Sequence, residues 1–155
     1  TFLRHDLAWF LNQQFLEKLP MFYGADTTAL LEINRHLEMN VATNGEFLAR
    51  EGELAREMHF ILSGQIHILK RNGDCDIELF EGAILGEVCL VFDMPSPYDA
   101  EVIITANLFT LSGTNFFEII MKFPTLVKRL HARGEAVYGD RWEFWQTQAL
   151  KVLDQ

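Results

Sequence analysis

A glycine, a glutamate and a short apolar run lie near the middle of the chain, and a proline-rich turn follows them in the stretch Leu85–Val102. Gly86 lets the backbone N–H groups around it approach a ligand closely. The apolar run Val88–Phe92 is long enough for one helical turn. N–H groups at a helix start can hold a phosphate, and the Glu87 carboxylate beside them can accept a sugar hydroxyl. The stretch therefore predicts an anion-binding turn with a carboxylate beside it, although Gly-Glu alone has low specificity.

Histidines and cysteines are the other candidates for chemistry. A cupin-type metal enzyme needs clustered ligands, typically a His-x-His pair, whereas His59 and His67 are eight residues apart. Cys75 and Cys89 are too few for a disulfide framework and lack metal-ligand spacing, and Cys89 fits a small buried residue. The remaining histidines lie outside the central segment: His5, His36 and His131. The sequence therefore predicts no catalytic residue and no metal site.

Length and composition favour one globular domain. The chain has 155 residues, of which 49% are hydrophobic, and a formal net charge of −9. The negative charge argues against nucleic acid or anionic lipid as the main partner. Two cysteines are consistent with a reducing, cytosolic setting, and the sequence has no signal peptide and no apolar run that could span a bilayer. Because Thr1 lies inside an apparent helix, we expect the chain to be a piece of a longer membrane protein.

Helices are expected at the start of the chain. Residues 2–18 predict a helix that Pro20 ends. Its apolar stripe fits either the domain's own core or a partner subunit. Asp26 is a suitable N-cap for a second helix that extends to about Arg35. The stripe consists of Leu3, Leu7, Leu11, Phe15 and Leu19.

Between Val41 and Ser112 the pattern changes to short apolar and polar alternations punctuated by glycines. Two Asn-Gly pairs, Asn44-Gly45 and Asn72-Gly73, favour tight hairpins. Strands with turns every 7 to 12 residues are typical of a closed barrel or jelly roll. The predicted fold class is α+β, an antiparallel β-roll flanked by N-terminal helices and a long C-terminal helix.

The C-terminal third is expected to be helical. A third helix should begin near Thr114 or Asn115, with Asn115 and Glu118 as a capping pair. Phe123-Pro124 marks a kink before a long helix. Trp142 and Trp145 lie on one face of that helix, so it should pack on the roll or on a neighbouring molecule. Two glycines, Gly134 and Gly139, weaken the helix and are the places where it could break.

Four segments carry a family resemblance. Leu3–Phe22 looks like linker and entry helices, Asn44–Gly64 like glycine-marked first strands, Gly86–Leu90 (GEVCL) like the start of a phosphate-binding cassette, and Phe123-Pro124 like the step before a C-terminal helix. In this order they resemble the cyclic nucleotide-binding domain in the cytosolic tail of cyclic-nucleotide-gated and hyperpolarization-activated cation channels. The resemblance covers nearly the whole chain. It divides the chain into linker helices (1–22), a β-roll with flanking helices (23–139) and a C-terminal helix extension (140–155).

The resemblance implies roles for particular residues. Gly86 and the N–H groups of Val88 and Cys89 would face the cyclic phosphate of cAMP or cGMP, and Glu87 would bind the ribose hydroxyl. The C-terminal helix would close over the base. Val137 and Arg141 are the candidates for its closing face.

One element of the family pattern is missing. The family has an arginine near the end of the cassette that pairs with the phosphate through two hydrogen bonds. Counting back from Ala100 places Tyr98-Asp99 there, and counting forward from Gly86 places Pro95-Ser96 near it, so no cation stands in either register. Residues 72–121 contain nine acids and no lysine, arginine or histidine. Losing a charge-assisted pair costs roughly 1.5–3 kcal/mol.

Several structural questions stay open at this point. Asp99 would repel a phosphate if it faced inward. Tyr98 fits either a rim position with its hydroxyl in water or a position inside the empty phosphate site. Four arginines outside the cation-free run could compensate: Arg50, Arg56, Arg133 and Arg141.

Two other users of the same fold fit less well. A catabolite-activator-type regulator carries a helix-turn-helix after the long helix, and the last forty residues here contain no such basic element. A kinase regulatory subunit keeps the cassette arginine and has a different entry segment.

The expected function is that of a non-enzymatic gating-coupling domain in a tetrameric, voltage-gated-like cation channel of the potassium-channel type. Its partners would be the pore and linker of its own homotetramer, on the cytoplasmic side of the plasma membrane. It would have no cofactor and no nucleic-acid partner, and it would meet the membrane only through a transmembrane part outside this chain. Binding of cAMP or cGMP should be weak or absent; the alternative is a working sensor with compensating contacts from the C-terminal helix.

Overall fold

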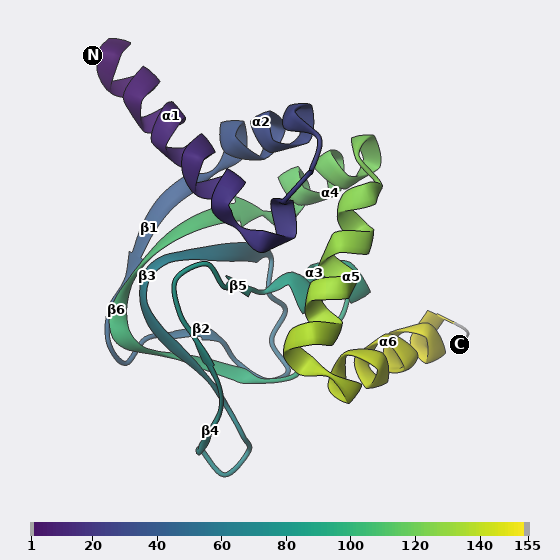
Figure 1. Cartoon of the computed structure of the whole chain (residues 1–155). Helices are drawn as coiled ribbons and strands as arrows, with labels where there is room; N and C mark the ends of the chain where they lie inside the picture. Colours follow the sequence, from purple (N-terminus) through teal and green to yellow (C-terminus); the bar gives the residue numbers. More distant parts are fainter. Residues whose placement is uncertain (1, 154–155) are drawn as a thin grey trace.

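The computed structural model describes residues 2–153, and the side chains of residues 10–151. Within these residues, six antiparallel strands form one sheet that curls into a roll, with helices before, within and after it (Figure 1). This confirms the predicted α+β roll. The strands are β1 (Glu38–Ala42), β2 (Phe47–Ala49), β3 (Glu57–Leu69), β4 (Cys75–Leu79), β5 (Ile84–Leu85) and β6 (Asp99–Ser112). The helices are α1 (Phe2–Lys18), the 3-10 helix η1 (Pro20–Phe22), α2 (Thr27–His36), α3 (Glu87–Phe92), α4 (Gly113–Lys122), α5 (Thr125–Tyr138) and α6 (Asp140–Leu153).

The two long strands β3 and β6 form the centre of the sheet, in the order β1-β6-β3-β4. β1 and β2 both pair with β6, one after the other along its length. The Asn44-Gly45 turn therefore does not close a hairpin, and that prediction is wrong. The turn is held instead by β6, since the Gly45 N–H donates to the Val102 carbonyl at 2.8 Å.

The second Asn-Gly pair does form the predicted hairpin, between β3 and β4. The Lys70 N–H donates to the Asp74 carbonyl at 2.8 Å, and the Gly73 N–H donates to the Lys70 carbonyl at 2.9 Å. Gly73 has a φ of +91°, which favours glycine. This hairpin projects from the roll in Figure 1.

The core consists of two clusters of buried apolar side chains. The first joins α1, η1, α2, α4 and α5 to one end of the roll, around residues such as Phe22, Phe60 and Leu130. The second fills the roll itself and extends to Tyr138, Trp142 and Trp145. The second cluster thus connects the strands to the two C-terminal helices, which confirms that the Trp142 and Trp145 face packs on the roll.

Helix α1 has the predicted bounds, but its buried face differs from the predicted stripe. Leu11 is 53% exposed, whereas Leu16 is fully buried. Phe15 contacts Phe109 edge-to-face with ring centroids 5.5 Å apart. Among the described side chains of α1, those that contact the core are Phe15 and Leu16 in its C-terminal half. The helix backbone extends away from the roll toward its N-terminus (Figure 1). The side chains of Leu3 and Leu7 lie outside the described residues.

Of the two N-caps that the sequence predicted, the one on α2 is confirmed and the one on α4 is wrong. Asp26 caps α2, since its carboxylate accepts the Thr28 N–H at 2.8 Å. Helix α4 begins one residue earlier than predicted. Its cap is Ser112, whose hydroxyl accepts the Asn115 N–H at 3.2 Å, so the expected Asn115–Glu118 capping pair is wrong.

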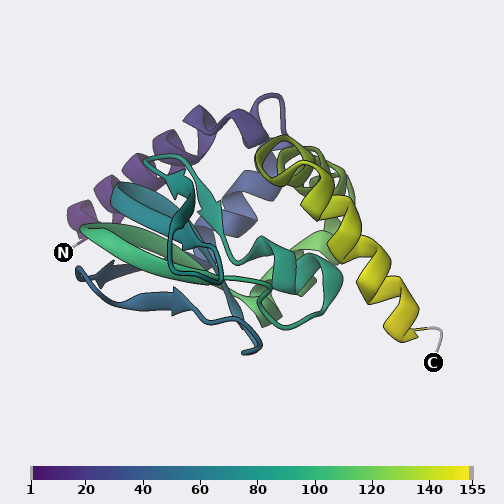
Figure 2. The same cartoon turned by 90° about the horizontal axis from the view of Figure 1, so that it is seen from below.

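The C-terminal helix is two helices, α5 and α6, that lie along one side of the roll (Figure 2). The chain turns at Gly139, with φ +60° and ψ −132°, a combination that strains any residue with a Cβ. Gly134 lies directly under the indole of Trp142. A Cβ there would be 2.3 Å from the ring. The two glycines therefore allow α6 to fold back against α5.

No helix within residues 2–153 combines the length and apolar content that crossing a bilayer requires.

Candidate functional site

The Gly-Glu turn is placed by β5 and α3. Strand β5 pairs with β3, and Gly86 follows it with a φ of +92°. A Cβ at Gly86 would lie 2.5 Å from the Glu57 carbonyl oxygen, so only glycine fits this turn. The next two residues of interest, Val88 and Cys89, are buried in the first turn of α3. The predicted one-turn helix after Gly86 is therefore present.

Glu87 is the most unusual group of the site. It is 1% exposed, and no donor among the described residues has good hydrogen-bond geometry to either carboxylate oxygen, although the Tyr138 hydroxyl and the Glu87 N–H lie close enough to interact with it. Burial raises the pKa of Glu87 from its ordinary value of 4.5 to about 7. The positive charge of Arg133, the Glu87 backbone N–H and the Tyr138 hydroxyl offset part of that rise. An unpaired buried acceptor is therefore available where a ribose hydroxyl was expected.

Tyr98, one of the positions at which the sequence predicted the family's arginine, is buried. Its side chain is 5% exposed, which excludes the rim position with its hydroxyl in water. Its ring stacks on Tyr138, with centroids 6.1 Å apart, and lies 6.2 Å from Trp145. We call the set of Phe92, Tyr98, Tyr138, Trp142 and Trp145 the aromatic cluster.

The aromatic cluster is tightly connected. The Phe92 and Trp142 centroids are 4.7 Å apart, and those of Tyr138 and Trp145 are 5.1 Å apart. The indole N–H of Trp142 donates to Nδ1 of His131 at 3.2 Å, so the buried donor is satisfied. The cluster thus binds α3, the cassette loop, α5 and α6 into one unit.

The two tyrosines face each other beside Glu87. Their hydroxyl oxygens are 3.5 Å apart. Burial first, and then the nearby Glu87 charge, raise the pKa of both Tyr98 and Tyr138. Both hydroxyls therefore stay protonated at neutral pH and carry no charge that could attract or repel a phosphate.

The loop before Tyr98 is held in place by hydrogen bonds to its backbone groups. The Ser96 hydroxyl donates to the Tyr98 carbonyl at 2.7 Å. The Gly52 N–H donates to the Ser96 carbonyl at 2.8 Å, and the Ser96 N–H donates to the Glu53 carbonyl at 2.9 Å. These hydrogen bonds fix the loop, so Tyr98 is not free to swing outward.

Of the four candidate compensating arginines, three are occupied or distant. Arg50 lies over the Phe47 ring, 3.6 Å from its centroid. Arg141 pairs with Asp76 on β4 and also donates to the Tyr138 carbonyl. Arg56 is exposed and lines a separate cleft with Cys89 and Leu90, in which no member of the aromatic cluster takes part among the described residues.

Arg133 is the cation beside Glu87. Its Nη1 is buried and has no hydrogen-bond partner among the described residues. Its charge lowers the Glu87 pKa, although the carboxylate oxygens remain without a hydrogen bond. Arg133 also lines a cleft of about 530 Å³ between η1, β5 and α5. The site therefore holds one carboxylate and one guanidinium, each with an unused polar atom.

The remaining predicted residues lie near the site rather than in it. Asp99 accepts the Glu51 N–H at 2.7 Å and so caps the loop before β3 from the outside. Val137 is half-buried against the roll and lines the 530 Å³ cleft. Arg141 is tied to Asp76. Unlike these three residues, Tyr98 lies beside Glu87 and stacks on Tyr138.

Two contributors were not predicted from sequence, Phe92 and Tyr138. Tyr138, Trp142 and Trp145 recur with helical spacing at i, i+4 and i+7, which is the signal that was available. That spacing does not reveal that the helix reverses at Gly139. The turn at Gly139 brings Trp142 and Trp145 of α6 against Tyr138 of α5.

Glu87 makes a testable contribution to pH dependence. Because its pKa is higher in the folded protein than the ordinary 4.5, the folded state binds the proton more tightly than the unfolded state. Folding stability should therefore fall as pH rises from about 4.5 to about 7, by roughly 3 kcal/mol. His59 acts in the opposite direction, since burial lowers its pKa from 6.5 to about 4 and stability rises through that window.

The Glu87 and His59 contributions to stability change over overlapping pH ranges. A comparison of wild type with Glu87→Gln isolates the Glu87 contribution, because His59 is present in both proteins. Relative to wild type, this variant should gain roughly 3 kcal/mol between pH 4.5 and pH 8, measured by urea unfolding at a series of pH values. Glu81→Gln, at an exposed position, is the control and should follow wild type. Parallel curves for wild type and Glu87→Gln would show that the carboxyl is not perturbed.

Comparisons with known proteins identify the family. Residues 40–123, more than half of the chain, match the family model of the cyclic nucleotide-binding domain. The mouse potassium/sodium hyperpolarization-activated cyclic nucleotide-gated channel 2 is 26% identical over 124 residues, which is 80% of this chain and 14% of the channel. The mouse cyclic nucleotide-gated channel beta-3 is 24% identical over 155 residues, 97% of this chain and 22% of that protein. The chain therefore spans less than a quarter of these relatives.

A solved structure shares the fold. The regulatory domain of Toxoplasma gondii PKA, crystallised with cAMP, superposes with a TM-score of 0.76 at 16% identity, over 84% of this chain and 51% of that one. At this identity the likeness concerns the fold alone.

Proposed function

The chain belongs to the cyclic nucleotide-binding domain family, and from this we propose that it is the regulatory domain of a cation channel whose nucleotide pocket is filled by its own side chains. The observation that carries the proposal is the buried Tyr98, which stacks on Tyr138 where the family has a phosphate-binding arginine. The domain acts by coupling movements and catalyses no reaction.

The coupling route is supported by the contacts of Arg129. This residue of α5 donates from Nη1 to the carbonyl oxygens of Met21 and Tyr23, both at 2.8 Å. A displacement of α5 relative to the roll would pull on η1 and so on α1, which extends away from the domain (Figure 1). Residues 1–22 then act as the linker to the pore of the same homotetramer, on the cytoplasmic side of the plasma membrane. A ligand shifts this equilibrium only by its differential affinity for the two positions.

Weak or absent cyclic nucleotide binding follows from the charges and the packing. A phosphate that entered the cassette would meet backbone N–H groups but no cation from residues 72–121. It would also have to displace the rings of Tyr98 and Trp145. The aromatic cluster thus favours the closed position of α5 and α6 without a ligand.

A second candidate is a working cAMP or cGMP sensor that uses another cation. It is favoured by one observation: Arg133, on the closing helix, has a buried Nη1 without a hydrogen-bond partner beside Glu87. If the aromatic cluster moved aside, this guanidinium would be the phosphate partner.

Calorimetric titration of the wild-type domain with cAMP and with cGMP separates the two candidates. We expect no saturation below millimolar nucleotide. A related domain that keeps the cassette arginine serves as the positive control in the same buffer. Micromolar binding that Arg133→Gln abolishes would overturn the closed-pocket proposal in favour of the sensor.

A further inference from the structure

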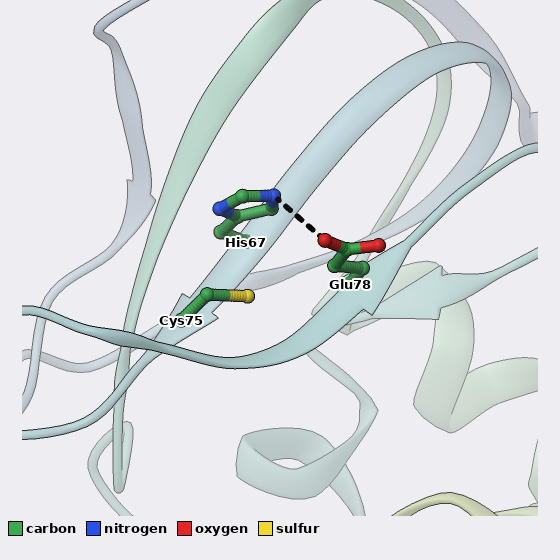
Figure 3. A group of neighbouring side chains, drawn as sticks. All are labelled: His67, Cys75 and Glu78. Carbon is green, nitrogen blue, oxygen red and sulfur yellow. Dashed lines mark ion pairs between the residues drawn. The ribbon is translucent and has the colours of Figure 1, made fainter.

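A group of metal-binding side chains lies on the outer face of the roll, away from the aromatic cluster. His67 of β3 and Cys75 and Glu78 of β4 each offer one donor atom, and the three atoms lie within 4.8 Å of one another. Figure 3 shows the three side chains pointing toward a common space between the strands. Their spacing along the chain gave no sign of this, because the hairpin register brings them together.

The hairpin places Cys75 by means of a β-bulge. Glu78 pairs directly with His67, so these side chains share a face of the sheet. In a regular strand Cys75, three residues before Glu78, would point to the opposite face. The register shifts between Ile68 and Leu69, so Cys75 pairs with Leu69 and joins the His67 face. Bulges of this kind re-aim side chains next to functional sites.

We propose that His67, Cys75 and Glu78 bind one divalent transition-metal ion, with Zn²⁺ the best match. A nitrogen, a sulfur and a carboxylate oxygen are all ligands that Zn²⁺ accepts, and three protein ligands leave one position for water. A thiolate disfavours the hard cations Mg²⁺ and Ca²⁺, which prefer oxygen. The site is independent of the proposed nucleotide pocket.

The distances suit a tetrahedral ion after small side-chain rotations. Bonds of about 2.0–2.3 Å to a central Zn²⁺ place neighbouring ligand atoms about 3.3–3.7 Å apart. Nε2 of His67 and Oε1 of Glu78 are already 3.7 Å apart. His67 is 19% exposed and acts as the anchor, whereas Glu78 is 51% exposed and Cys75 is also exposed, so both can move inward. The Gln65 amide, 3.0 Å from Nε2 of His67, must turn away.

The surrounding charges favour a cation. Glu101 pairs with His67 in register on the other side, on β6. Desolvation, Glu78 and Asp76 raise the pKa of Cys75 and Lys70 lowers it, so the thiol is protonated without a metal. Its proton is released to solvent when the metal binds the sulfur. The only other cation of the hairpin loop, Arg71, is paired with Glu51 at 3.2 Å.

Asp76 pairs with Arg141 of α6, so an ion bound to this hairpin would act on the strand that holds α6.

Metal titration of the whole chain, free of any affinity tag and kept reduced with a phosphine, tests the proposal. Zn²⁺ is titrated in competition with a chromophoric chelator, and Co²⁺ serves as the spectroscopic probe. We expect one ion per chain and a thiolate-to-cobalt charge-transfer band. Each of His67→Gln, Cys75→Ser and Glu78→Gln should lower Zn²⁺ affinity at least tenfold, and Cys75→Ser should abolish the band. Excess Mg²⁺ or Ca²⁺ should not compete.

Glu81→Gln is the matched control, since it removes the same charge from an exposed position in the turn after β4. Its affinity should stay within twofold of wild type. Equal weakening by Glu78→Gln and Glu81→Gln, or a cobalt spectrum without a thiolate band, would overturn the proposal, because the ion would then be held by general charge attraction. Cys75 is exposed, so Cys75→Ser tests ligation without a folding defect.

Discussion

Replacing Tyr98 with arginine together with Trp145→Ala should raise the affinity of the domain for cAMP about 30- to 100-fold. The arginine would supply the bidentate partner that the cassette lacks, a gain of roughly 2–3 kcal/mol. Trp145→Ala is needed because Trp145 and Tyr138 flank the space that Tyr98 occupies. Calorimetric titration of this double variant and of the wild type with cAMP measures the gain in affinity.

Asp99 is left unchanged in this design, although the sequence alone left open that it could repel a phosphate. Its carboxylate accepts the Glu51 N–H at an exposed position, so it should be retained. The loop before Tyr98 also keeps its full length, because three hydrogen bonds of Ser96 to backbone groups hold it.

The matched control is Tyr98→Leu with Trp145→Ala, which vacates similar space without adding a cation. Losing a buried tryptophan costs about 3–5 kcal/mol, so circular dichroism and urea unfolding must show that both double variants are folded. Equal cAMP affinity in the arginine and leucine variants would mean that access, rather than the missing charge, limits binding.

Gly134→Ala should detach α6 and destabilise the domain, which is the reverse of the usual effect. In an exposed helix, glycine to alanine gains about 1 kcal/mol. Here the added Cβ would lie 2.3 Å from the fully buried Trp142 ring. Overpacking of this kind costs about 1–3 kcal/mol. We expect lower stability in urea, a red shift of tryptophan emission and faster tryptic cleavage after Arg141.

Glu135→Ala is the control for that experiment, since Glu135 is the next residue in α5 and is exposed. It should leave stability within about 0.5 kcal/mol of wild type and tryptophan emission unchanged. A stabilised Gly134→Ala protein with wild-type emission would contradict the packing of Trp142 against Gly134.

The sequence was sufficient for local features. Alternating residues and turn glycines predicted the β-roll, Asp26 predicted the start of α2, and Pro124 predicted the break between α4 and α5. Gly86-Glu87 predicted the turn before α3, because a positive φ and a short apolar run are encoded by neighbouring residues. The family motifs are local in the same sense, and the match of residues 40–123 to the family model confirmed the family.

Features that depend on residues distant in sequence required the tertiary structure. Asn44-Gly45 has hairpin chemistry, yet β6 pairs with both flanking strands and so prevents the hairpin. The outward side of α1 at Leu11 depends on where the roll ends, which the helical period does not report.

The site shows the same division. The sequence by itself shows that residues 72–121 contain no lysine, arginine or histidine, because a side-chain type is a local fact. Whether the Tyr98 side chain is exposed or buried depended on the turn at Gly139. It depended also on the space beside Gly134, which has no side chain and so allows the Trp142 ring to pack there. The grouping of His67, Cys75 and Glu78 depended on one bulge in β4. Register and helix reversal are set by the packing of the whole core, which no local pattern of residues contains.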